Sequence, residues 1–137
     1  MKTLLTIGGA AIILLIGGAT LTNSLQEEGD VIARNGLHWH PKLEIYVKGE
    51  KVAIPQNIGI GAVHQPMHTH DDLPVIHLEF NGTVHASDLM LGQFFTNWGT
   101  DMHSFGQGPH MLVNGVENTE YERYILRDGD VIELHYD

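Results

Sequence analysis

The sequence contains no cysteine, which excludes disulfides, thiolate metal sites, iron–sulfur clusters and cysteine nucleophiles. Basic residues are also scarce: 7 Lys and Arg against 17 Asp and Glu give a formal charge of −10 with His neutral. A chain this acidic is repelled by phosphate backbones, and no run of Lys or Arg reverses the charge locally. We therefore expect no binding to nucleic acid.

What remains is the composition of an ordinary folded protein with an excess of histidine. The 137 residues suit a single domain. A hydrophobic content of 42% and a charged content of 18% are typical of a folded chain, so global disorder is excluded. The sequence has no phosphate loop, dinucleotide fingerprint or nucleophile elbow. The 10 histidines are the feature that composition leaves unexplained.

One uncharged stretch, residues 3–26, precedes the rest of the chain. Residues 4–21 are apolar apart from two threonines and several glycines, and 18 residues come close to a bilayer span. Lys2 precedes this stretch and acidic residues follow it, which places the N-terminus in the cytoplasm and the domain outside. We expect residues 1–26 to be a single-pass transmembrane anchor or uncleaved signal in the cell membrane. A signal peptide cleaved near residues 17–19 is the alternative.

The chain after this segment predicts a linker at 27–37 and one extracytoplasmic domain at 38–137. Alternating polar and apolar residues indicate strands at 38–47, 75–80 and 131–136, with a further strand at 110–113. Residues 56–74 read as a long loop, and the turn at 81–82 returns into a strand at 83–85. Apolar spacing predicts one helix at 91–98, with Ser87 or Asp88 as its N-cap and Gly99 at its end.

This order of elements predicts an α+β fold. We expect a single small β-grasp-like domain, in which one helix covers one face of a mixed sheet and the other face is open to water.

The histidines fall into patterns typical of a metal site. His38 and His40 form an HxH pair, and on a strand both imidazoles leave the same face. His77 lies on the polar face of another predicted strand, so neighbouring strands would give three imidazoles with an open fourth position. The loop segment HQPMHTHDD adds a second HxH pair, His68 and His70. The predicted metal ligands are therefore His38, His40, His68, His70 and His77.

Copper or zinc is the expected ion, because neutral imidazoles suit both. The absence of thiolate and the nearby Met67, Met102 and Met111 leave copper plausible. Glu79 or Asp71 would serve as a further ligand or would fix a histidine tautomer. The remaining histidines fall into two groups: His64 and His110 stay open, and His85, His103 and His135 read as surface residues. Clustered imidazoles that titrate near neutrality would also make a pH sensor.

A cupin is a second interpretation of the same residues. The segment His68–Asp71 is similar to the start of a cupin motif, but the glutamate of that motif would fall on Pro74 or Val75. A helix-centred order of elements also fits a jelly roll poorly.

Several longer segments are similar to those of a known protein family: residues 38–60, 68–80 and 91–99, and the closing VNG and DGDVIELHY. They cover nearly all of the exported domain, and the chain resembles a family of small exported or membrane-anchored histidine-rich proteins of bacteria and archaea. The resemblance implies an extracytoplasmic domain in which the HxH, HTHD and LGQFF elements recur together, and it supplies no catalytic residue. The chain departs from the pattern at Lys48, where relatives often carry Asn, and at Met90, where they often carry Thr.

Together these patterns predict a membrane-tethered extracytoplasmic protein that binds copper or zinc for storage, delivery or protection. An enzyme is one alternative, with the same ion activating water or dioxygen and Glu79 or Asp71 as general base. An accessory subunit of a membrane complex is the other, with the small residues 8–11 packing against a partner helix.

Overall fold

The structure is a computed structural model that describes residues 30–137. The predicted membrane segment, 1–26, and the beginning of the predicted linker lie outside the described residues. Among residues 30–137, no helix is long and apolar enough to cross a membrane.

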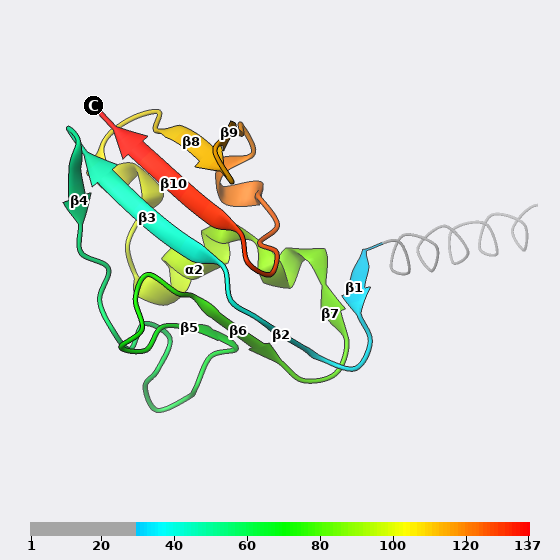
Figure 1. The fold of residues 1–137 in the computed structure, drawn as a ribbon. Helices are drawn as coiled ribbons and strands as arrows, with labels where there is room; N and C mark the ends of the chain where they lie inside the picture. The colour runs from blue at the N-terminus through cyan, green and yellow to red at the C-terminus, as the bar shows by residue number, and fades with distance from the viewer. Residues whose placement is uncertain (1–29) are drawn as a thin grey trace, which may run out of the picture. The chain divides into compact units, whose positions relative to one another are not determined.

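The main sheet has five strands and mixed direction. Its order is β4-β3-β10-β8-β9 (Figure 1). The two central strands, β3 and β10, run parallel, with Val131 beside Lys42 and Tyr136 beside Val47, and the remaining neighbours are antiparallel. The strands are β3 (Lys42–Val47), β4 (Glu50–Val52), β8 (His110–Val113), β9 (Val116–Glu117) and β10 (Val131–Tyr136).

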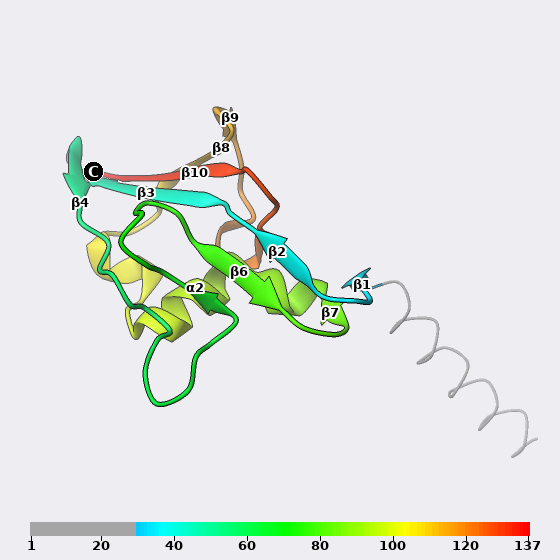
Figure 2. The same ribbon diagram turned by 60° about the horizontal axis from the view of Figure 1, so that its bottom comes forward.

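Alternation along the central strands gives the sheet a buried face. Leu43 and Ile45 on β3 are fully buried, as are Ile132 and Leu134 on β10. Helix α2 (Leu91–Trp98) lies on this side of the sheet (Figure 2). The mixed sheet and the single α-helix of the described residues confirm the predicted α+β class.

Helix α2 follows the predicted spacing. Leu91, Phe94 and Phe95 are buried, and Gly99 ends the helix in the left-handed conformation at φ 72°. Glycine adopts this conformation without the steric cost of a β-carbon.

The predicted N-cap of this helix is wrong. Ser87 and Asp88 lie one element earlier, in the 3-10 helix η1 (Ala86–Leu89), and Met90 occupies the N-cap position of α2. Met90 is extended, at ψ 139°, and so separates the two helices. The Asp88 carboxylate instead accepts a hydrogen bond from the backbone N–H of His85, at 2.8 Å. Two further 3-10 helices follow, η2 (Met102–Phe105) and η3 (Tyr121–Arg123).

A second sheet of three short antiparallel strands carries one histidine on each strand. Its order is β2 (Leu37–Trp39), β6 (His77–Phe80) and β5 (Met67–His68). The strand predicted at 38–47 is therefore two strands, and β2 leads through Pro41 into β3 of the main sheet (Figure 1). The carbonyl of Pro41 accepts from the N–H of Ile76 at 2.8 Å, which continues the pairing past the bend.

The prediction of an unbroken loop at 56–74 is wrong, because β5 lies inside it. Two residues are too few to show a strand period in the sequence. Met67 packs into the core at 1% exposure, and its carbonyl accepts from the Asn97 side chain at 2.9 Å, which ties β5 to helix α2. The core therefore holds one face of β5, and the other face carries His68.

The remaining strands form a two-stranded sheet. β1 (Val31–Ala33) pairs with β7 (Val84–His85), so the range expected to be a linker contains a short strand. The strand after the turn at 81–82 exists as predicted, but it pairs with β1 instead of returning along β6.

Candidate metal centre

Six imidazoles gather on the outward face of the three-stranded sheet and its adjoining loop. Neighbouring ring centroids lie 4.3–5.0 Å apart along the series His38, His40, His77, His70, His68 and His64. We call these six residues the histidine face.

Strand register explains why the rings share this side. His38 pairs with Glu79 across β2 and β6, and His68 pairs with His77 across β5 and β6. Paired residues point to the same side of a sheet, and alternation sends their neighbours Trp39, Leu78 and Met67 the opposite way, toward the core.

The structure thus brings together all five histidines that the sequence proposed as ligands. The sixth, His64, is not among the ligands that the sequence predicts, although it stands four residues before His68 in the same segment. His110 lies on β8 of the main sheet, 3.8 Å from Glu117. The other three lie outside the histidine face: His85 on β7, His103 in η2 and His135 on β10.

His68 is fully buried and held in one tautomer. Its Nδ1 lies 2.9 Å from the carbonyl oxygen of Gln65, and because a carbonyl only accepts, Nδ1 carries the hydrogen. Its Nε2 is buried and has no hydrogen-bond partner within residues 30–137. Burial lowers the pKa of His68, which favours the neutral ring and leaves a lone pair on Nε2.

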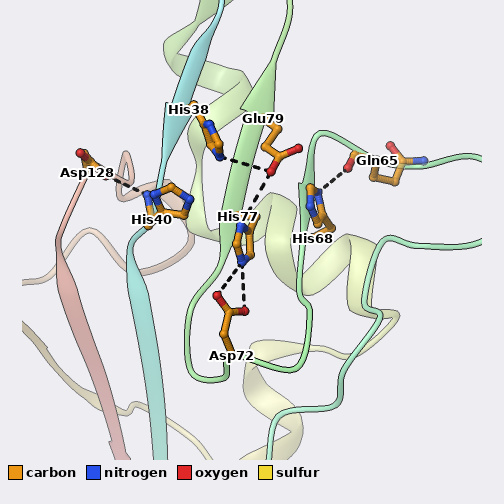
Figure 3. A network of polar contacts seen from close by, with 8 residues as sticks. All are labelled: His38, His40, Gln65, His68, Asp72, His77, Glu79 and Asp128. Atoms are coloured by element: carbon orange, nitrogen blue, oxygen red, sulfur yellow. Dashed lines mark hydrogen bonds and ion pairs between the residues drawn. The ribbon is translucent and has the colours of Figure 1, made fainter.

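A carboxylate holds His77 in the other tautomer, with the hydrogen on Nε2 (Figure 3). Its Nε2 lies 3.0 Å from each oxygen of Asp72, and its Nδ1 is buried without a hydrogen-bond partner in the described part of the chain. The hydrogen bond from His77 lowers the pKa of Asp72, so this carboxylate is ionised and accepts. Nδ1 of His77 is therefore the free nitrogen.

The lack of a hydrogen-bond partner at these two buried nitrogens is costly. A buried polar atom without a partner costs about 1–3 kcal/mol. Metal-ligating histidines usually donate their other N–H to a carboxylate or a backbone carbonyl, which is the arrangement at His77 and His68. Both rings are thus preorganised to give a lone pair to a cation.

Glu79 adds a negative charge among the rings. One of its oxygens lies 3.3 Å from Nε2 of His38 and 3.8 Å from Nδ1 of His77 (Figure 3). The sequence proposed Glu79 or Asp71 as the carboxylate of the site. Glu79 does lie in the face, whereas the carboxylate that orients His77 belongs to Asp72, the residue after Asp71.

The donor atoms form three overlapping sets within the described residues. In each set, the candidate ligand atoms all lie within 4.8 Å of one another. The sets are His38, His40 and His77; His64, His68 and His70; and His68, His77 and Glu79.

Buried hydrogen bonds fix the loop that supplies His68 and His70. Thr69, between them, is fully buried; its hydroxyl donates to the carbonyl of Pro55 at 2.9 Å and accepts from the N–H of Ile58 at 3.0 Å. On the other side of the face, the backbone N–H of His40 donates to the Asp128 carboxylate at 2.8 Å. Both histidine pairs are therefore anchored to the body of the domain.

The three methionines that kept copper plausible lie away from the solvent. Met67, Met102 and Met111 are buried in the core at 1%, 2% and 0% exposure, and β5 directs Met67 away from His68. The donors that the histidine face offers are imidazole and carboxylate, which suit zinc and copper(II) among other ions.

An open depression adjoins the centre of the face. His38, His64, His68 and Glu79 line it, together with residues of the turns on either side. Solvent and small molecules therefore reach the exposed side chains of His38, His64 and Glu79.

Comparisons of the chain with protein-family models, curated proteins and solved structures find no match.

Proposed function

We propose that the chain is a metal-binding protein that holds copper or zinc on the histidine face. The observation that carries the proposal is the pair of orphaned nitrogens, Nε2 of His68 and Nδ1 of His77, found within residues 30–137. The two rings stack at a centroid distance of 5.5 Å, and each ring's other nitrogen is bonded to a fixed acceptor. Cation binding would satisfy both nitrogens.

Charge supports the same interpretation. The chain carries a formal charge of −10, and Glu79 and Asp72 lie against the rings. A negative field favours cations over anionic ligands at this surface.

We infer further that the domain is tethered to the outer side of the cell membrane and acts in metal binding, storage or delivery. The apolar residues 4–21 and the charges that flank them support the tether. The motifs also support membership in the histidine-rich exported family that they resemble. The five-stranded order with two parallel central strands supports a β-grasp-like core.

The depression beside the face favours an enzyme as the second candidate. It would give a bound ion an exchangeable position, and Glu79 would be the carboxylate placed to take a proton. A spectrum of the loaded protein that never responds to azide or cyanide would count against this candidate.

Elemental analysis tests the metal-binding proposal. The full chain is produced with copper and zinc supplied and is purified without an affinity-metal column. We expect stoichiometric metal in the natural chain and in the control His103→Gln/His135→Gln, which alters two histidines outside the face. The variant His68→Gln/His77→Gln removes a ligand from every set and should carry none.

His68 is buried, so the double variant could lose its fold for structural reasons. Nuclear magnetic resonance of the natural chain avoids that difficulty, because the nitrogen shifts of each ring report which atom binds. We expect zinc to move Nε2 of His68 and Nδ1 of His77. A chain without metal, or with metal that leaves both nitrogens unmoved, overturns the proposal.

A further inference from the structure

The histidine face has too few free nitrogens to use all its ligand sets at once. His77 belongs to two sets, but its Nε2 is engaged with Asp72, which leaves only Nδ1. His68 likewise belongs to two sets, and its Nδ1 is engaged with Gln65. One lone pair binds one ion. The central set of His68, His77 and Glu79 therefore excludes both of the others, whereas the two outer sets share no residue.

This count leaves two alternatives for the loaded protein. Either one ion occupies the central set, or two ions occupy the outer sets, one at His38, His40 and His77 and the other at His64, His68 and His70. Both alternatives satisfy the two orphaned nitrogens. They differ in stoichiometry and in which of the exposed histidines they use.

We propose that the histidine face is a two-ion site, with one ion in each outer set. This inference rests on the proposed function, and it adds the number and position of the ions. Each outer set offers three imidazoles, and the central set offers two imidazoles and a carboxylate. Three imidazoles with an open position are an established set for zinc.

The two HxH pairs of the sequence also fall into separate outer sets. Each outer set contains one HxH pair, His38 with His40 and His68 with His70. Each pair is completed by a third ring, His77 from β6 or His64 from the loop. The central set separates His68 from His70, omits His38 and His40, and so leaves four imidazoles of the face unused.

The main cost of this arrangement is the repulsion between two dications. The negative charge of Glu79 lies between the two outer sets and reduces that repulsion. Its carboxylate approaches His38 and His77 of one outer set, at 3.3 and 3.8 Å, and is grouped with His68 of the other. Two-metal sites in enzymes hold paired ions as close as about 3.5–4 Å. Asp72 contributes a further negative charge through its contact with His77.

Zinc stoichiometry distinguishes the alternatives. Metal-free full chain is titrated with zinc by calorimetry, and the bound zinc is counted by elemental analysis. We expect two zinc ions in the natural chain, one in His40→Gln, one in His64→Gln and two in the control His103→Gln. His40 and His64 each belong to a single outer set, and neither is buried, so the fold should survive their replacement.

The central alternative gives a different pattern. One zinc ion in the natural chain that both single variants retain and Glu79→Gln loses would overturn the two-ion inference and leave the proposed function standing. One ion that a single one of the two variants loses would also overturn it. No zinc in the natural chain would overturn the proposed function itself.

Copper(II) gives an independent readout. Two ions in adjacent sets broaden each other's electron paramagnetic resonance spectrum, so the fully loaded natural chain should show a coupled signal. The His40→Gln chain should show the signal of an isolated ion. An isolated signal in both proteins contradicts the pair.

Discussion

The Asp72 carboxylate accepts a hydrogen bond from Nε2–H of His77, and each of its oxygens lies 3.0 Å from Nε2. The other ring nitrogen, Nδ1, has no hydrogen-bond partner within residues 30–137. A contact at the edge of the site thereby decides which atom of His77 faces the other histidines. The Gln65 carbonyl does the same for His68 from the opposite side. The orientation of these two rings is therefore set by groups that lie outside every candidate ligand set of the described chain.

The first prediction concerns this contact. Asp72→Ala should weaken zinc binding about 10–100-fold, because loss of a ligand's hydrogen-bond partner typically has an effect of that size. Asp71→Ala removes an equal charge from the neighbouring exposed position and is the matched control. Competition against a chelator measures both affinities. Equal losses in the two variants would show that Asp72 acts only through its charge.

A second prediction concerns the buried threonine between His68 and His70. Thr69→Val keeps the shape of the side chain but leaves the Pro55 carbonyl and the Ile58 N–H without their hydroxyl partner. We expect the free energy of unfolding to fall by about 1–3 kcal/mol. Urea unfolding of the metal-free chain measures this, and Thr69→Ser, which keeps the hydroxyl, should lose less. A valine variant as stable as the serine variant would contradict the role of the hydroxyl.

The sequence predicted those parts of the site that depend on strand alternation. His38, His40 and His77 lie where a period of two directs them, and α2 lies where the spacing of Leu91 and Phe94 indicates. These patterns repeat over enough residues to be recognised. The pairing of two short strands, β2 and β6, then brings the three rings together.

Features that depend on a single contact could not be predicted. β5 is two residues long, so its pairing with β6, which sets His68 beside His77, leaves no periodic trace. The roles of Asp72 and Gln65 depend on the path of the loop. The burial of Met67 follows from the same short strand, because alternation sends it away from His68.

A third prediction concerns the same loop at Gly59. It adopts φ 73°, and a β-carbon there would lie 2.6 Å from the backbone oxygen of Met67 on β5. Gly59→Ala should therefore destabilise the domain by roughly 1–2 kcal/mol from the left-handed backbone alone, with the close contact adding to this. It should also weaken zinc binding, because β5 carries His68.

Gly61 provides the control for that substitution. A β-carbon at Gly61 would meet nothing within 4 Å. Gly61→Ala should therefore leave the thermal midpoint and the zinc affinity close to those of the natural chain. Similar losses in both alanine variants would mean that loop flexibility, and not the contact with Met67, is what matters.

The last prediction concerns the stability of the domain at high pH. Tyr136 is 2% exposed, and its hydroxyl donates to the Met102 carbonyl at 2.6 Å. Burial raises the pKa of Tyr136 from 10.0 to about 12. Because the pKa is higher in the folded state, the stabilisation is complete below pH 10.0 and is lost as the pH rises toward 12. The loss should approach about 1.4 kcal/mol per pH unit for this one group.

Tyr136→Phe isolates that contribution. The variant lacks the hydrogen bond to Met102 and should be less stable than the natural chain at pH 8. It also lacks the titrating hydroxyl, so the difference in free energy of unfolding should shrink as the pH rises above 10. Burial also raises the pKa of Tyr124, but this residue is present in both proteins and its effect cancels. Urea unfolding at pH 8, 9, 10 and 11 measures the difference, and parallel curves across this range would show that Tyr136 does not ionise differently in the folded and unfolded chains.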